Sequence, residues 1–102
     1  MPLTEISVRV TKKNIKDAIA LIKLRPEIPT EGHCPVALAL WDRGWRAYIT
    51  RKCATVYRAQ DYTLYNIFSL PEVAQEFVRN FDEGNPVQPI EFTLERNMDE
   101  EA

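Results

Sequence analysis

The sequence predicts an α+β domain: a four- or five-stranded antiparallel or mixed sheet with helices packed mainly on one face. Segments that alternate polar and apolar residues, typical of half-buried strands, occur near both ends of the chain and in its middle. Two segments of helical periodicity and one short apolar segment separate them. The length of 102 residues favours one domain. We expect that domain over residues 1–95 and a flexible acidic tail over residues 96–102.

The first quarter of the chain is expected to form a strand and a helix. Residues 5–10 alternate with period two, which predicts a strand with its three aliphatic side chains inward. Thr11 offers a hydroxyl to the free amides of a helix that begins at Lys12. That helix carries its apolar residues on one face: Ile15, Ala18, Ile19 and Ile22. Pro26 ends it, and residues 25–32 are expected to be a loop.

The second helix is expected to be the most buried element. Pro35 suits a first helical position, where its missing amide would have no partner anyway. Residues 36–41 are apolar on every side of the helix. Gly44 can adopt the left-handed conformation that ends a helix.

The rest of the chain predicts a two- or three-stranded meander, a helix and a last strand. The meander strands are dense in β-branched and aromatic residues and cover residues 48–50, 54–57 and 62–68. Ser69 and Glu72 have the spacing of a capping box, which predicts a helix start. Its apolar stripe comprises Val73, Ala74, Phe77, Val78 and Phe81, and Gly84 ends it. Residues 90–95 alternate as a final strand.

Composition favours an intracellular globular protein. Apolar residues make up 45% of the chain and charged residues 27%, which is ordinary for a folded domain. The longest apolar run, residues 36–41, is far short of the roughly 20 residues that span a bilayer. The first ten residues do not resemble a signal peptide. We therefore expect no membrane association, free thiols and a reducing compartment.

Charge divides the chain into two unlike parts. Residues 1–60 hold eleven Lys or Arg and five acids, a net charge of +6. Residues 61–102 hold two Arg and ten acids, a net charge of −8. Such a division can orient the protein toward a charged partner, or it can let one half pair with the other.

Cys34 is the strongest candidate for a chemically reactive side chain. A thiol at a helix N-terminus faces unpaired amides and the positive end of the helix dipole, which lower its pKa and favour a reactive thiol. The opposing interpretation is a structural cysteine at the start of a buried helix. His33 is the only histidine, and no CxxC pair is present, so we expect no catalytic residues, no metal site and no cofactor.

A segment rich in cations and aromatic rings is the candidate binding region. Its residues are Arg43, Trp45, Arg46, Tyr48, Arg51, Lys52 and Arg58. Cations beside rings on a sheet are typical of single-stranded nucleic-acid binding, and they also suit a protein partner. A sequence pI near 5.4 weighs against nucleic acid.

Two motifs in combination resemble a group of small, functionally uncharacterised phage and prophage proteins. They are Cys34-Pro35-Val36-Ala37-Leu38-Ala39 and the Leu70-Pro71 helix that ends in Phe81-Asp82-Glu83-Gly84. The resemblance implies a setting, the cytoplasm of a bacterial host, and no activity. The expected function is a non-enzymatic phage-type accessory protein that binds a host or phage protein. The alternative is single-stranded nucleic-acid binding through residues 43–58. Oligomeric state is left open.

Overall fold

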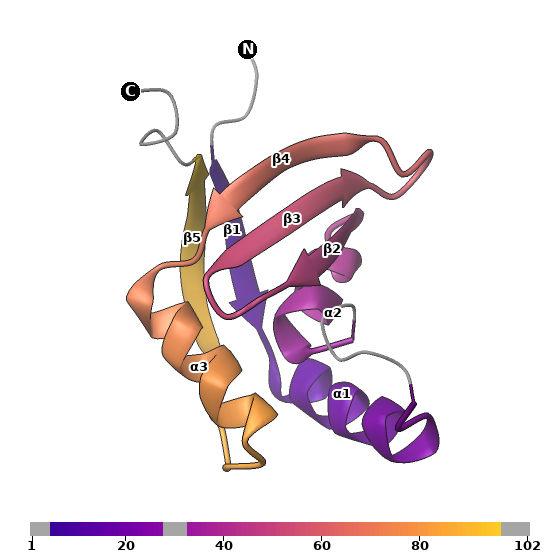
Figure 1. The fold of residues 1–102 in the computed structure, drawn as a ribbon, viewed down its shortest axis with the longest axis vertical. Helices are drawn as coiled ribbons and strands as arrows, with labels where there is room; N and C mark the ends of the chain where they lie inside the picture. The colour runs from indigo at the N-terminus through magenta and orange to yellow at the C-terminus, as the bar shows by residue number, and fades with distance from the viewer. Residues whose placement is uncertain (1–4, 28–32, 97–102) are drawn as a thin grey trace.

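The computed structural model describes residues 5–27 and 33–96 and contains three helices and five strands there. In chain order these are β1 (Glu5–Val10), α1 (Lys12–Leu24), α2 (Pro35–Asp42), β2 (Trp45–Ile49), β3 (Cys53–Arg58), β4 (Leu64–Ser69), α3 (Glu72–Asp82) and β5 (Ile90–Arg96) (Figure 1). The expected α+β class is confirmed. The flexible tail was expected to begin at residue 96, but Arg96 is the last residue of β5, so that expected boundary is one residue too early. Residues 97–102 of the expected tail and residues 28–32 of the expected loop lie outside the described residues.

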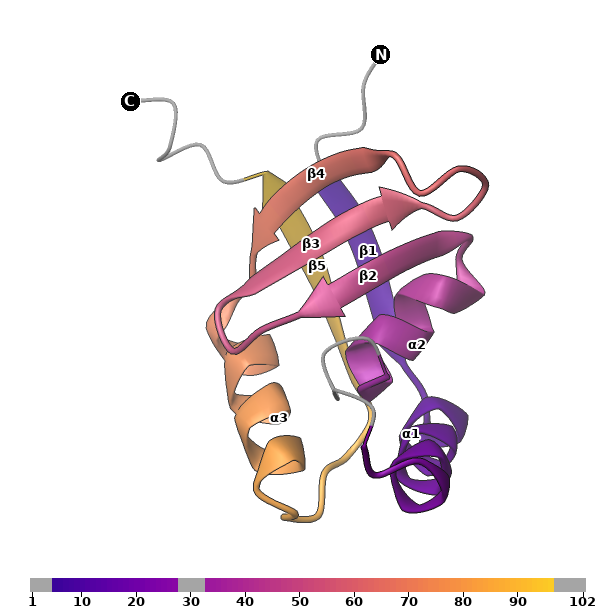
Figure 2. The same ribbon diagram turned by 45° about the vertical axis from the view of Figure 1, so that its right-hand side comes forward.

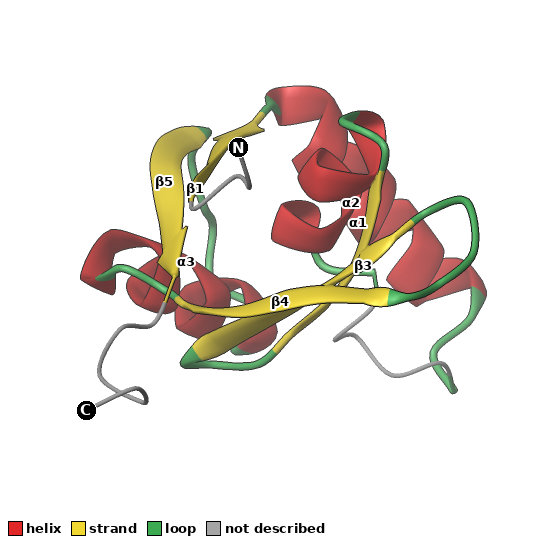
Figure 3. Cartoon of the chain, turned by 90° about the horizontal axis from the view of Figure 1, so that it is seen from above, coloured by secondary structure: helices red, strands yellow, loops and turns green. Residues whose placement is uncertain are grey.

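The five strands form one antiparallel sheet in the order β1-β5-β4-β3-β2. The first strand therefore pairs with the last, and β1 and β2 are the edge strands. Seen from above, the sheet curls strongly, so that β3 and β4 run across the direction of β1 and β5 (Figure 3). The concave side of this curled sheet holds the core.

Helix α2 fills the concave side between the two edge strands, and it contacts both β1 and β2 (Figure 2). All residues from Pro35 to Leu40 are buried, as the apolar sequence predicts. Ala37 and Ala39 are small enough to let strands approach the helix closely. Gly44 takes φ +89° just after the helix, a conformation that glycine adopts at little cost. The chain then turns back as β2.

Asn14 joins the start of α1 to the end of α2. Its Oδ1 accepts hydrogen bonds from the Thr11 amide at 2.9 Å and the Thr11 hydroxyl at 3.0 Å, while its Nδ2 donates to Oδ2 of Asp42 at 2.8 Å. The Thr11 hydroxyl in turn accepts from the Asn14 amide. The predicted Thr11 cap is confirmed, with Asn14 as its reciprocal partner.

The start of α3 differs from the expectation. Ser69 does not cap the helix, because it is the last residue of β4 and pairs with Cys53 and Glu95 in the sheet. The N-cap residue is Pro71, whose side chain has no atom that can accept a hydrogen bond from the helix amides. The capping-box prediction was wrong because the spacing of Ser69 and Glu72 cannot reveal that the serine belongs to a strand.

Two apolar residues assigned to buried helix faces are exposed. Val73 on α3 is 50% exposed and Ile19 on α1 is 41% exposed. The stripes themselves are confirmed at Ala18, Ala74 and Phe77, which are buried. Each helix lies at the margin of a small sheet, so only the centre of its apolar stripe reaches the core.

Phe77→Ala should lower the free energy of unfolding by about 3–5 kcal/mol, because it leaves a cavity in the core. Phe77 is only 5% exposed and belongs to the main cluster. Val73→Ala on the same helix is the control and should change stability by less than about 0.5 kcal/mol. Urea denaturation measures both. Equal effects would contradict the packing of α3 described above.

Asn14→Ala should cost about 1–3 kcal/mol, because it leaves the Thr11 amide and the Asp42 carboxylate without their partner. The effect should couple to Asp42: in a double-mutant cycle with Asp42→Ala, the two losses should sum to more than the loss in the double variant. Additive losses would show that the hydrogen bond between the two helices contributes nothing to stability.

Candidate functional site

The convex side of β2, β3 and β4 carries two rows of side chains that cross the three strands. The strand register places Arg46, Tyr57 and Leu64 opposite one another, and likewise Tyr48, Thr55 and Ile67. We call these six residues the outer face. The alternate positions point to the core, where Ala47, Ile49, Ala54, Val56 and Phe68 are buried. Strand alternation alone therefore presents the outer face to solvent.

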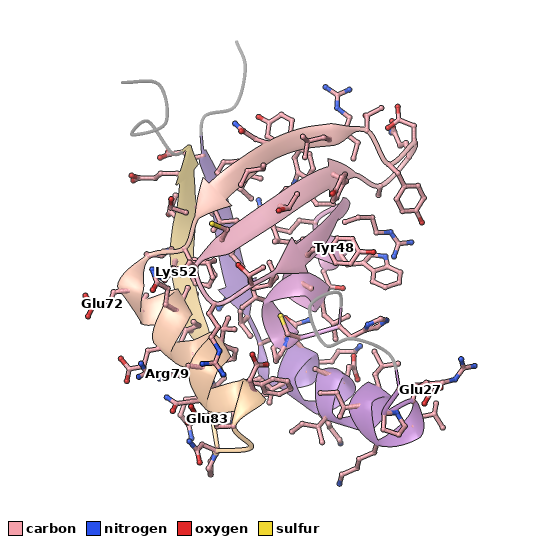
Figure 4. The ribbon with its side chains drawn as sticks, viewed as in Figure 1. Glu27, Tyr48, Lys52, Glu72, Arg79 and Glu83 are labelled. Atoms are coloured by element: carbon pink, nitrogen blue, oxygen red, sulfur yellow. The ribbon has the colours of Figure 1, made fainter. Side chains whose placement is uncertain are left out.

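The outer face is more apolar and aromatic than an ordinary wet sheet surface. Tyr48 is 57% exposed, Leu64 56% and Ile67 41%. Tyr48 and Tyr57 meet edge to face with ring centroids 6.1 Å apart. Tyr48 projects from β2 away from the core (Figure 4). Exposed clusters of this kind mark interaction sites in soluble proteins.

The convex side of β1 and β5 is polar by contrast. Arg9 and Glu91 lie opposite each other there and form an exposed ion pair at 3.0 Å. Ser7 pairs with Thr93 on the same side. The apolar character is thus confined to the half of the sheet formed by β2, β3 and β4.

Arg46 is held against aromatic rings at the margin of the outer face. Its guanidinium carbon lies 3.6 Å from the centroid of Trp41 and 5.7 Å from that of Tyr62. Its Nε is buried and has no hydrogen-bond partner among the described residues. Contact with the two rings therefore positions this cation. Trp41 is 46% exposed and Tyr62 is 63% exposed, so both rings extend the apolar surface beyond the strands.

Cations stand at both ends of the outer face. Arg43 and Arg58 lie where β2 begins and β3 ends, and Arg51 and Lys52 lie in the turn between the two strands. Five or six strand residues separate the ends by about 17–20 Å. Lys52 is at the end nearer α3 (Figure 4). Among the described residues, none of these cations forms a salt bridge within 4 Å.

Trp45 does not join the other predicted binding residues. It points to the core side of β2, is half-buried, and lies 4.8 Å from Tyr65 between ring centroids. The register irregularity between Val56 and Tyr57 makes this contact feasible, because it inserts Tyr65 as an extra residue in β4. Sequence reasoning missed Tyr62, Leu64 and Ile67, which lie outside the cation-rich segment. It counted Trp41 among the aromatic residues beside the cations but also expected its helix to be the most buried element, whereas Trp41 is 46% exposed.

The β3–β4 turn that presents Tyr62 is held by local hydrogen bonds. Oδ1 of Asp61 accepts from the Thr63 hydroxyl at 2.7 Å and from the Thr63 amide at 3.0 Å. These bonds lower the pKa of Asp61, with a smaller contribution from the charge of Arg58. Tyr62 itself takes φ +59°, the left-handed region that residues with a side chain seldom occupy.

Cys34 lies in the core and not at a reactive surface. The residue is 2% exposed at the start of α2. Burial raises the pKa of its thiol to about 11, and this outweighs the opposing effect of the amides of Ala37 and Val36. The thiol lies at a helix N-terminus as the sequence predicts, but desolvation favours its neutral form. These observations favour the structural interpretation.

Neither a metal centre nor a membrane segment is indicated in the described part of the chain. Residues 5–27 and 33–96 contain no group of three or more His, Cys, Asp or Glu side chains placed to hold a metal ion. No helix within the same ranges has the length and apolar character needed to cross a bilayer. No family model, curated protein or solved structure matches this chain.

The raised pKa of Cys34 predicts a loss of stability in alkali. The native thiol holds its proton up to about pH 11, whereas an unfolded thiol releases it near 8.5. The stabilising contribution is therefore complete below about pH 8.5 and is lost as the pH rises toward 11. Thermal melts should show the advantage of wild type over Cys34→Ala shrinking between pH 8 and 10.5. A pH-independent advantage would contradict a raised pKa of the Cys34 thiol, and alkylation with a midpoint below about pH 7 would favour a reactive thiol.

Proposed function

We propose that this chain is a small, non-enzymatic accessory protein of phage type that binds a protein partner through its outer face. The observation that carries the proposal is the exposed cluster of Tyr48, Leu64 and Ile67 on the convex side of the sheet, extended by Trp41 and Tyr62. Tyrosine, tryptophan and arginine are the residues that dominate binding energy in protein interfaces. The phage setting rests on the resemblance of the α2 and α3 motifs.

The partner is expected to be acidic around an apolar centre. Residues 41–67 hold five Lys or Arg and two Asp. Their cations have no close carboxylate among the described residues. Complementary charge on a partner steers its approach and fixes its orientation, while the apolar centre supplies affinity.

Single-stranded nucleic acid is the second candidate, because cations flank aromatic rings on a sheet. Two features favour a protein. The outer face includes the aliphatic side chains of Leu64 and Ile67, and one face of the Trp41 ring is already covered by Arg46. A mixed oligonucleotide should therefore show no saturable binding at physiological salt. Saturable binding that disappears in the Arg46→Glu, Arg51→Glu double variant would favour nucleic acid.

The test of the protein-binding function compares two double variants. Tyr48→Ser, Leu64→Ser removes the centre of the outer face. Ile19→Ser, Val73→Ser removes apolar side chains of similar exposure elsewhere and is the matched control. Proteins captured from nuclease-treated bacterial lysate are identified, purified and titrated by calorimetry.

Wild type and the control should bind the purified partner equally, and the outer-face variant should bind at least tenfold more weakly. Affinity should also fall with added salt, because the charges of an acidic partner are then screened. Equal affinity of both double variants, or capture that requires nucleic acid in the lysate, would contradict the proposal.

A further inference from the structure

Arg46 is a cation of the outer face whose guanidinium group is fixed by aromatic rings. The central carbon of that group lies 3.6 Å from the centroid of Trp41 and 5.7 Å from that of Tyr62. Both distances are within the range over which a ring attracts a cation. Contact with a ring covers the flat face of the group, whereas its N–H bonds point outward in its plane. Stacking therefore orients the group without using its hydrogen-bond donors.

The guanidinium group of Arg46 lacks an anionic partner within residues 5–27 and 33–96. Its Nε is buried and has no hydrogen-bond acceptor there, and the group forms no salt bridge within 4 Å. Nη1 and Nη2 are not buried in this way, and the side chain as a whole is half-buried. The group has thus lost part of its hydration without gaining an acceptor. An anion that reaches it from outside replaces little water and supplies the missing partner.

The two carboxylates that adjoin the supporting rings in sequence are oriented by other groups. Oδ2 of Asp42 accepts a hydrogen bond from Nδ2 of Asn14 at 2.8 Å. Oδ1 of Asp61 accepts from the hydroxyl and the amide of Thr63 at 2.7 Å and 3.0 Å. Neither carboxylate forms a salt bridge with Arg46. The charge of Arg46 is therefore not neutralised by the carboxylates beside its rings.

The position of Arg46 on the sheet indicates what kind of molecule carries the anion. The strand register places Arg46, Tyr57 and Leu64 in one row across β2, β3 and β4. Because adjacent strands lie about 4.8 Å apart, the exposed Leu64 is about 10 Å from Arg46 along that row. A single acidic group among apolar side chains fits such a surface. A nucleic-acid strand fits it less well, since it brings a further phosphate charge with every nucleotide.

We propose that Arg46 binds a carboxylate of the protein partner through paired hydrogen bonds and so determines which partners the outer face accepts. This inference rests on the proposed protein-binding function and names the group that is recognised on the partner. Nη1 and Nη2 donate to the two carboxylate oxygens, since Nε is covered. The rings hold the guanidinium group in place before binding, so little conformational freedom is lost when the pair forms.

Three acetylated tripeptides test the chemistry of the ligand. The first has glutamate between two leucines and an amidated C-terminus, the second has glutamine in place of glutamate, and the third is the glutamine peptide with a free C-terminal carboxylate. Each is titrated into the full-length protein while nuclear magnetic resonance follows the Nε–H signal of Arg46. A carboxylate peptide should bind about tenfold more tightly than the neutral glutamine amide. Whichever carboxylate peptide binds more tightly shows whether a side chain or a chain terminus is recognised.

Variants of the protein test the same pair from the other side. Arg46→Lys keeps the charge but removes the planar pair of donors, so it should abolish the advantage of the carboxylate peptides over the neutral one. Backbone amide signals of β2 report binding in this variant. Arg79→Lys makes the same change on α3, away from the outer face, and should have no effect (Figure 4). Trp41→Leu removes the stacking support and should weaken binding several-fold although Arg46 is retained.

Three results would overturn the inference. They are equal binding of all three peptides, unchanged selectivity in Arg46→Lys, and a short thymidine oligonucleotide that shifts the Arg46 signal at a lower concentration than either carboxylate peptide. If the purified partner depends on Tyr48 and Leu64 but binds Arg46→Lys like wild type, the proposed function stands and carboxylate recognition alone fails. If neither dependence is found, both fail.

Discussion

The structure depends on enclosing a short helix that has no polar side. Six consecutive residues of α2, Pro35 to Leu40, are buried, so protein must surround the helix on every side. A flat sheet would cover only one side, whereas a curled antiparallel sheet reaches it from β1 and from β2. Among the described residues, β4 pairs with β5 only at Phe68 and Ser69, so the two halves of the curled sheet are joined over a short length.

The same constraint leaves the convex side as the exposed side of the sheet. The concave side is filled by α2 and the core residues around it, and the convex side of β1 and β5 carries the Arg9–Glu91 ion pair. The outer face of β2, β3 and β4 is the part of the sheet where exposed rings and aliphatic side chains gather. The core and the proposed binding surface therefore lie on opposite sides of the same three strands.

Local patterns predicted most of the fold and only part of the site. The period-two segment at residues 5–10, the cap at Thr11 and the apolar run after Pro35 each depend on neighbours in sequence, and each was confirmed. The assignment of Ser69 failed because strand pairing competes with helix capping and involves the distant Glu95. Trp45 was placed with the binding residues, yet the bulge that brings Tyr65 beside it depends on register between strands. Register is not encoded in any one segment.

At Tyr62, selection for stability and selection for partner binding favour different residues. A left-handed conformation costs a residue with a Cβ about 1 kcal/mol or more, and glycine avoids this cost. A library of variants sorted for thermal resistance alone should therefore accumulate glycine or asparagine at position 62. The same library sorted for partner capture should retain an aromatic ring there, since the ring adjoins Arg46. If the two libraries differ at position 62, the tyrosine present there indicates that binding, and not stability, determines the residue in this turn.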